Sequence, residues 1–282
     1  MTAPRSELYE DIYRRAFSFG RNWQKFLERL DEASIERARK SLVDFLELPS
    51  LEGRTFVDVG CGSGLFSLAA WQLGADRVVS IDVDPASVAC AEYLREKYAS
   101  SSERWEIRSG SALDREFLAS LGQFDIVYSW GVLHHTGAMW QAIENVHALV
   151  RPGGMFELAI YNDCRGFPSS QLWRSIKRLY ARGGPLVRGP MTAGYLSTFF
   201  AALLLRGRNP VRYVREYGQR SGRGMSFYRD VVDWLGGYPY EFATAAEVAD
   251  FHVRRGFKTL KIIETQRIGC NQFLFRRGKD ES

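Results

Sequence analysis

The residues in this sequence best suited to cofactor binding are an acidic residue and three glycines that follow it at alternate positions. Asp58 is followed by Gly60, Gly62 and Gly64 within the run FVDVGCGSGLFS. Glycine has no Cβ, so the backbone can turn sharply there and a ligand can approach it closely. A helix expected to start near Leu65 would point its free N–H groups at whatever lies over the turn. This arrangement predicts a pocket for a nucleotide-type cofactor.

The spacing argues against two common phosphate-binding loops. A dinucleotide fingerprint reads G-x-G-x-x-G or A, but the sixth position counted from Gly60 is Leu65. A P-loop needs a Lys after its last glycine, and none follows Gly64. The acidic residue and G-x-G-x-G resemble the first motif of class I S-adenosylmethionine (SAM)-dependent methyltransferases, [DE]-x-G-x-G-x-G. The alternative is an ordinary strand, turn and helix whose glycines serve packing.

The resemblance implies SAM as the cofactor, with Asp58 holding its cationic amino group directly or through water. It also places further contacts after the next three strands of the expected sheet. The cofactor-binding residues that we expect are Asp58, Gly60, Cys61, Gly62, Gly64, Asp82, Val83, Ser111, Ala112, Ser129 and Trp130.

Asp82 ends the second expected strand, roughly 20 residues after the glycine loop. A carboxylate at this place accepts hydrogen bonds from ribose hydroxyls, and SAM carries a free ribose. The alternative is that Asp82 caps the next helix, although Asp84 is better placed for that because Pro85 follows it. In the family an acidic residue after the third strand often contacts the adenine. Ser111 stands at that position here, so the adenine contact falls to Ser111 or to Asp114.

Two histidines follow the fourth expected strand, at residues 124–130. Ligands of open α/β sheets lie at the carboxyl ends of the strands, which is where His134 and His135 are expected. Either imidazole could take a proton from a hydroxyl nucleophile at neutral pH, so both are candidate catalytic residues. The alternative is that they pack or orient substrate. No metal is expected, because no Cys, Asp or Glu stands beside them at ligand spacing.

Similarity to the family runs without a gap from about residue 50 to residue 163. It implies an α/β fold: a Rossmann-like doubly wound sheet of seven strands, the last antiparallel, flanked by helices. We expect an N-terminal helical cap at 1–50, the SAM-binding core at 51–164, a basic and apolar helical lid insertion at 165–240, and a closing helix and strands at 241–282. Within the insertion, the Gly-rich and aromatic stretch 221–241 is expected to be a loop folded back on the site. The candidate substrate contacts are Trp23, Tyr161, Arg223, Tyr228 and Asp230.

The charge of the insertion bears on the substrate. Residues 165–230 hold thirteen Lys or Arg and two Asp or Glu, which gives +11 and leaves 5 − 11 = −6 for the rest of the chain. The run 193–205 is nearly all apolar and is bracketed by arginines. This favours a small-molecule or lipid-like acceptor of acyl, quinone or polyketide type, with peripheral contact at an anionic membrane surface or an acidic carrier protein. RNA is the rival partner, and a buried helix or a dimer interface is the structural alternative.

The cysteines, the absence of a visible targeting segment and one absent motif narrow the compartment and the reaction that we expect. Four scattered cysteines favour neither a disulfide framework nor a zinc site, and no signal peptide or membrane-spanning run is visible, so the cytoplasm is the expected compartment. No N-P-P-[YF] motif follows the fourth strand, which favours an oxygen acceptor over an amide or base nitrogen. The function expected is O-methylation by in-line transfer from SAM. The alternatives are an RNA methyltransferase and a non-catalytic SAM-binding protein, and an aminopropyl transferase is disfavoured by the basic insertion.

Overall fold

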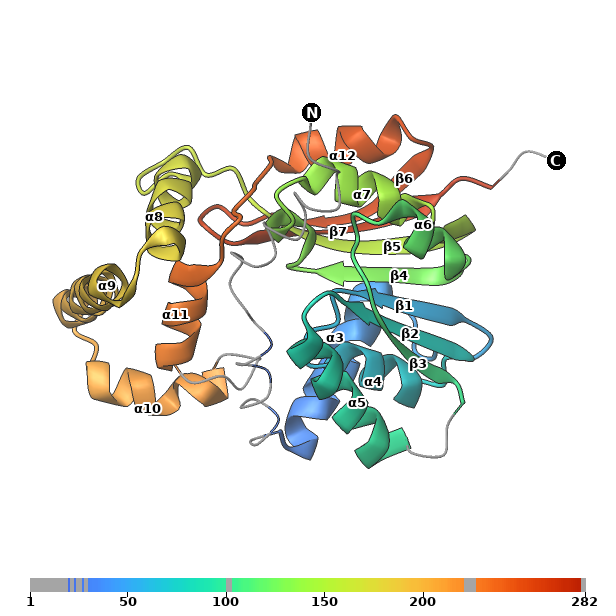
Figure 1. Ribbon diagram of the computed structural model, residues 1–282, viewed down its shortest axis with the longest axis horizontal. Coiled ribbons are helices and arrows are strands. Elements are labelled where there is room, and N and C mark those ends of the chain that lie inside the picture. Colours follow the sequence, from blue (N-terminus) through green and yellow to red (C-terminus); the bar gives the residue numbers. More distant parts are fainter. Residues whose placement is uncertain are drawn as a thin grey trace. The chain divides into compact units, whose positions relative to one another are not determined.

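The computed structural model describes Gly20, Trp23, Leu27 and residues 30–99, 103–220 and 227–279. The chain divides into two compact units, which we treat separately. The core unit comprises residues 19–170 and 241–282, and the helical unit comprises residues 1–18 and 171–240 (Figure 1). Most of the expected N-terminal cap therefore lies outside the described residues.

A seven-stranded sheet forms the centre of the core unit, in the order β3-β2-β1-β4-β5-β7-β6. The first five strands pair in parallel, and β7 runs antiparallel to both β5 and β6. This confirms the fold expected from the sequence. The strands are β1 (Thr55–Val59), β2 (Arg77–Asp82), β3 (Trp105–Ser109), β4 (Phe124–Trp130), β5 (Val150–Tyr161), β6 (Phe257–Ile263) and β7 (Cys270–Arg277).

Helices cover both faces of the sheet, because the central strands are apolar on both sides and must be shielded from water. One face carries α3 (Glu32–Leu46), α4 (Leu65–Gln72) and α5 (Pro85–Ala99) (Figure 1). The other carries α6 (Arg115–Ser120), α7 (Met139–His147) and α12 (Ala245–Val253). Two of these helices start with side-chain caps: Asp31 caps α3, and Thr244 and Glu247 form a capping box on α12.

Two local features shape the chain between β4 and β5. Residues 151–154 lie within β5, where Gly153 takes a φ of +77° and the pairing with β4 shifts register. After β4 a short 3-10 turn, η1 (Leu133–His135), forms first, and α7 begins only at Met139. Gly137 lies between them with a φ of +77°, which a helix cannot accommodate.

The described part of the helical unit consists of four helices with their own apolar core (Figure 1). They are α8 (Ser170–Arg182), α9 (Pro185–Leu205), α10 (Pro210–Arg220) and α11 (Phe227–Gly236). The expectation of a loop over 221–241 is therefore wrong for residues 227–236, which form α11. Phe227, Val231 and Leu235 recur every four residues and bury one helical face against Tyr180. No helix in the described part of the chain is long and apolar enough to cross a bilayer.

The segment containing the helical unit leaves and rejoins the sheet at adjacent points. Asn162, just after β5, forms a parallel bridge with Ala243, just before α12. Ala243 N donates to Tyr161 O at 3.0 Å, and Asp163 N donates to Ala243 O at 3.1 Å. Ser170 Oγ donates to Asn162 O at 2.8 Å on the outgoing side. Both ends of the excursion are thus fixed by the core itself.

A pair of histidines is buried beneath α7 and α12. The rings of His147 and His252 lie 4.8 Å apart between centroids, and His252 stacks on Phe275 at 3.9 Å. Burial lowers the pKa of His147 to about 3 and that of His252 to about 4. The positive charges of His252 and of nearby arginines lower the pKa of His147 further. Both groups are therefore neutral in the folded protein at pH values where the unfolded chain is protonated.

We predict that this pair makes the fold acid-sensitive. Because both folded pKa values lie below the ordinary 6.5, stability is complete above pH 6.5 and is lost as the pH falls toward 4. Between pH 7 and pH 5 the loss should be about 2 kcal/mol per histidine. Urea unfolding of the His252→Phe variant should show roughly half the pH dependence of the wild type. An unchanged pH slope would assign the acid sensitivity to other groups.

Candidate active site

The glycine loop lies where β1 ends and α4 begins, at the carboxyl edge of the sheet. Gly60, Gly62 and Gly64 have φ angles of +78°, +55° and +79°, a backbone region that side chains disfavour. Gly60 N donates to Ile81 O at 2.8 Å, which fixes the loop to β2. A Cβ at Gly60 would stand 2.3 Å from Val132 Cγ1, so no side chain fits there. The sequence pattern is thus required by both conformation and space.

Asp82 connects the glycine loop to the end of β2. Its Oδ2 accepts from Gly62 N at 2.9 Å, and its Oδ1 accepts from Asp84 N at 2.9 Å. Asp84 Oδ1 in turn accepts from Ala86 N at 2.9 Å and so caps α5, the role that the sequence left open between the two carboxylates. A carboxylate has about four acceptor sites, so Asp82 keeps capacity for further donors. Val83, next along the chain, is 39% exposed.

Asp58 ends a chain of buried hydrogen bonds that crosses three strands. Trp105 Nε1 donates to Ser80 Oγ at 2.8 Å, Ser80 Oγ to Ser67 Oγ at 2.6 Å, and Ser67 Oγ to Asp58 Oδ2 at 2.7 Å. Burial raises the pKa of Asp58 to about 7, with the Asp82 charge adding to it, and burial likewise raises the pKa of Asp82 to about 6. Sequence reasoning missed the two serines and the tryptophan. The signal for the two serines was a polar residue among the apolar residues of α4 and β2.

The other expected cofactor residues lie around the same edge but differ in accessibility. Ser129 is fully buried, and its Oγ donates to Val59 O at 3.0 Å, so this hydroxyl joins β4 to β1. Cys61 is buried in the loop, and burial raises the pKa of its thiol well above the usual value. Trp130, the last residue of β4, is half-buried.

The loop after β3 is organised by its own polar groups. Ser111 Oγ accepts from Leu113 N at 3.1 Å, and Asn145 Nδ2 donates to Ala112 O at 3.1 Å from α7. Asp114, the alternative adenine contact, caps α6 by accepting from Phe117 N at 3.0 Å. Asp114 is thus engaged in capping, and Ser111 stays the other candidate for the adenine contact.

Two described residues of the N-terminal region lie directly against this edge. A Cβ on Gly62 would stand 2.9 Å from Trp23 Nε1, so the indole ring covers the bare backbone of the loop. Gly20 N donates to Asp84 Oδ2 at 3.0 Å, and a Cβ on Gly20 would be 2.6 Å from Ala86 Cβ. Trp23, a candidate substrate contact, therefore lies beside the glycine loop.

An aromatic cluster lies beyond the ends of β4 and β5. The His134 and Tyr161 rings are 3.9 Å apart, those of His134 and His135 are 4.5 Å apart, and those of His135 and Tyr161 are 5.4 Å apart. His134 is fully buried, and its Nδ1 accepts from Tyr161 N at 3.3 Å. Glu241 N donates to His134 O at 3.0 Å. His135 is half-buried, so of the two histidines it is the one that a ligand can reach.

The remaining candidate substrate residues belong to the helical unit. Tyr228 is 58% exposed on α11, and Asp230 Oδ2 accepts from Tyr217 Oη at 2.6 Å within the same unit. Arg223 lies outside the described residues. The structure brings Tyr161 together with the two histidines, and it assigns Asp230 a bond inside the helical unit.

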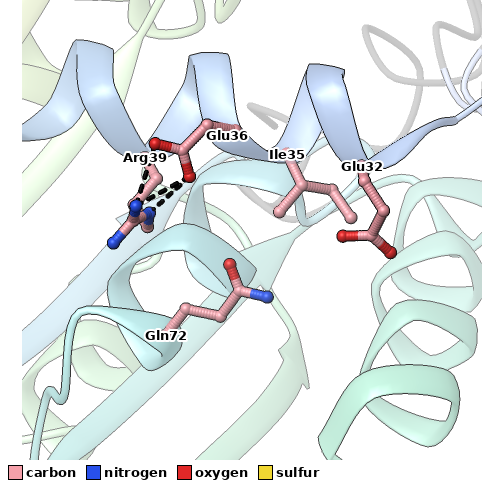
Figure 2. Close-up of a pocket in the computed structure, with 5 residues that line it drawn as sticks. All are labelled: Glu32, Ile35, Glu36, Arg39 and Gln72. Atoms are coloured by element: carbon pink, nitrogen blue, oxygen red, sulfur yellow. Dashed lines mark hydrogen bonds and ion pairs between the residues drawn. The ribbon is translucent and has the colours of Figure 1, made fainter.

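A hollow on the helical face of the core unit lies away from this edge (Figure 2). Four of its lining residues, Glu32, Ile35, Glu36 and Arg39, come from α3, and Gln72 comes from the last turn of α4. The α4 helix starts at the glycine loop, so the hollow lies about 12 Å from it, the length of eight helical residues. Arg39 Nε donates to Glu36 Oε2 at 2.8 Å, so these two opposite charges are paired with each other. We assign no chemistry to this hollow.

Comparison with known proteins finds similarity to methyltransferases. Residues 57–156, from β1 to β5, match the family model described as "Methyltransferase domain". The ubiquinone biosynthesis O-methyltransferase of Pseudomonas paraeruginosa is 33% identical over 147 residues, which cover 50% of this chain and 57% of that protein. The ribosomal protein L11 methyltransferase of Tolumonas auensis is 29% identical over 115 residues, covering 41% and 38% respectively. The chain thus spans less than two thirds of either relative.

A solved structure supports the fold independently of sequence. PKMT2 from Rickettsia typhi, determined in complex with AdoHcy, superposes with a TM-score of 0.57 at 14% identity, over 83% of this chain and 50% of that one. At this identity the likeness concerns the fold. Residues 57–156 thus match a methyltransferase domain, and the strand order of the core unit agrees with that match.

Proposed function

We propose that this protein transfers a methyl group from SAM to an oxygen nucleophile on a small-molecule or lipid-like acceptor. The observation that carries the proposal is the side-chain-free glycine loop joined by hydrogen bonds to the Asp82 carboxylate at the carboxyl edge of the sheet. Such a loop admits a ligand against the backbone, and the carboxylate supplies acceptors for its hydroxyls.

The chemistry of the residues fits SAM. Two carboxyl groups, Asp58 and Asp82, lie on either side of the loop and complement a cationic amino acid part and a ribose. Val83 presents an exposed apolar side chain after Asp82, which suits the flat face of an adenine. Trp23 covers the loop at Gly62 and would shield the bound methionine part from water. A P-loop has a Lys after its last glycine, which binds phosphate, and this loop has no Lys after Gly64.

The protein's own task in methyl transfer is alignment and proton removal. SAM supplies a methyl group already activated by its sulfonium, so the site has to hold an acceptor oxygen in line with it and exclude water. His135, half-buried at the end of β4, is the residue we assign to take the proton of an acceptor hydroxyl. The buried His134 and Tyr161 pack around the His135 ring and fix its orientation. His134 is thus assigned to positioning and Tyr161 to the acceptor side.

The acceptor class rests on three observations. The relative from Pseudomonas paraeruginosa is named as an O-methyltransferase of ubiquinone biosynthesis. No N-P-P-[YF] motif is present at the end of β4, where the sequence reads Ser129, Trp130 and Gly131. The helical unit combines arginines with exposed apolar side chains, which suits an anionic or lipid-bearing partner at a membrane surface.

A protein or RNA acceptor is the second candidate function. The relative from Tolumonas auensis is named as a methyltransferase of a ribosomal protein, and thirteen cations in residues 165–230 could neutralise several phosphates. A protein that binds SAM without turnover is the third possibility. These alternatives share the cofactor site and differ only in what receives the methyl group.

One labelling experiment separates the three. The protein is incubated with methyl-labelled SAM and cell extract, and label is followed into lipid, small-molecule, protein and RNA fractions. We expect label in the lipid or small-molecule fraction, lost with Gly62→Arg, whose side chain would collide with the site of Trp23. Label confined to protein or RNA would overturn the acceptor class. SAM binding by calorimetry without label in any fraction would support the non-catalytic alternative.

The raised pKa values of the two carboxyl groups give a separate prediction. At pH 6.5 Asp58, with a pKa of about 7, is mostly protonated in the free protein, and Asp82, with a pKa of about 6, is partly so. A cation favours the ionised form of a nearby carboxyl. SAM binding should therefore release about one proton at pH 6.5 and fewer at pH 8, and its affinity should rise with pH between these values.

Calorimetry at pH 6.5 in two buffers of different ionisation enthalpy measures this release. The Asp58→Asn variant is the matched control, because its amide can still accept from Ser67 Oγ but cannot ionise. We expect the buffer dependence to fall sharply in that variant. A binding enthalpy that is independent of buffer in the wild type would contradict the prediction.

A further inference from the structure

Apolar side chains are exposed where α9 ends and α10 begins. Figure 1 shows the two helices. Leu204 and Leu205, the last two residues of α9, are 62% and 89% exposed, whereas Leu203 beside them is buried. On α10, Val211 and Val214 are also exposed, and their spacing of three places them on one helical face. The opposite face of α10 packs its tyrosines into the apolar core of the unit. The apolar exposure is therefore a property of the outer side of the turn between α9 and α10.

Positive charge surrounds these four side chains. Arg206 and Arg208 lie in the turn between the two helices, and Arg212 and Arg215 lie on α10, all of them exposed. Residues 204–217 hold one carboxylate, Glu216, whose Oε1 accepts from Arg212 Nε at 2.6 Å. The net charge of this short segment is therefore 4 − 1 = +3. We name the eight side chains the α9–α10 corner.

We propose that the α9–α10 corner is a docking surface for an anionic lipid bilayer. Leucine and valine side chains gain by leaving water for the acyl boundary, and the arginines gain by meeting acidic headgroups just above it. A second copy of this chain would bring four more arginines against these four. Nucleic acid would complement the arginines and leave the leucines in contact with a charged backbone. A bilayer with acidic headgroups complements both kinds of side chain at once.

The proposed function includes a partner at a membrane surface. The α9–α10 corner is the site that we assign to that contact, so this proposal rests on the proposed function. It does not depend on methyl transfer, so a binding assay without SAM tests it separately. Docking at this corner would hold the protein where an acceptor with a lipid tail is concentrated.

Vesicle sedimentation of the full chain tests the proposal, with phosphatidylcholine vesicles and vesicles in which phosphatidylglycerol replaces a third of the lipid. We expect binding at least ten times tighter to the acidic vesicles, weakening with salt. Arg206→Gln with Arg208→Gln should weaken it about 25-fold, since each surface arginine contributes roughly a factor of five. Leu204→Ser with Leu205→Ser should weaken binding while leaving its salt dependence unchanged.

Two matched controls lie on the same unit. Leu186→Ser changes a leucine that is 91% exposed at the other end of α9, and Arg178→Gln changes an exposed arginine on α8. Both should bind acidic vesicles like the wild type, and circular dichroism should show every variant folded. Equal binding to both vesicle types, equal loss in the control variants, or binding to structured RNA with none to vesicles would each overturn the proposal.

Discussion

His135→Gln is expected to lower kcat by about 100- to 10,000-fold, the range that a general base contributes to proton transfer. Glutamine keeps a polar side chain of similar reach but cannot take up a proton at neutral pH. The affinity for SAM should stay close to that of the wild type, because the proposed cofactor contacts lie at the glycine loop and at Asp82 at the end of β2. The measurement is steady-state kinetics with the acceptor recovered from the labelling experiment, together with calorimetry of SAM binding.

A pH–rate profile distinguishes proton removal from a packing role. The wild-type rate should rise with pH as the imidazole loses its proton, and this ascending limb should disappear in His135→Gln. Added imidazole should restore part of the rate to His135→Ala, which leaves a gap at the ring position. His134→Gln is the control: His134 is fully buried, so the variant should lose stability while the rate of its folded fraction keeps the ascending limb. An ascending limb that persists in His135→Gln would exclude His135 as the base.

Asp82→Ala should weaken SAM binding by about 1.5–3 kcal/mol, which corresponds to roughly a 10- to 150-fold rise in Kd. The substitution removes the acceptor proposed for the ribose hydroxyls and also frees Gly62 N and Asp84 N, so the loop loses its connection to β2. Asp82→Asn retains one acceptor oxygen and should fall between the alanine variant and the wild type. Calorimetry with SAM and with its demethylated product provides the measurement.

Asp76→Ala is a matched control for this series. Asp76 precedes the same strand, and its Oδ1 also accepts from a glycine amide, Gly53 N, at 3.1 Å, but at the opposite edge of the sheet. It should lower stability modestly and leave the Kd for SAM unchanged. If Asp76→Ala and Asp82→Ala affected binding equally, the cofactor contact assigned to Asp82 would be lost and a purely structural role would remain.

Much of the core unit could be predicted because local signals and tertiary structure agree there. β2 and β4 have the bounds expected from their apolar runs, and Asp31 and Thr244 start helices as capping residues do. The order of the elements then followed from the family resemblance. Residues near the glycine loop could be named in advance because one motif fixes where strand, turn and helix meet.

The remainder depends on contacts that sequence spacing does not display. In the reading of residues 221–241 as a loop, the glycines at positions 222, 224, 236 and 237 outweighed the four-residue spacing of Phe227, Val231 and Leu235 that builds α11. The chain from Trp105 to Asp58 joins residues 47 positions apart, so no local pattern reveals it. Which of two adjacent histidines is buried was equally hidden, because it depends on how η1 packs against β5.

The bridge between Asn162 and Ala243 bears on how proteins of this kind can diversify. Because the two positions are neighbours, the segment between them can be replaced by a longer, shorter or unrelated segment while the strands of the sheet keep their positions. Selection for a new acceptor can then act on the exchanged segment alone, while the cofactor half is inherited intact. A chimaera that carries the corresponding segment of another methyltransferase between Asn162 and Ala243 should bind SAM with unchanged affinity and methylate a different acceptor.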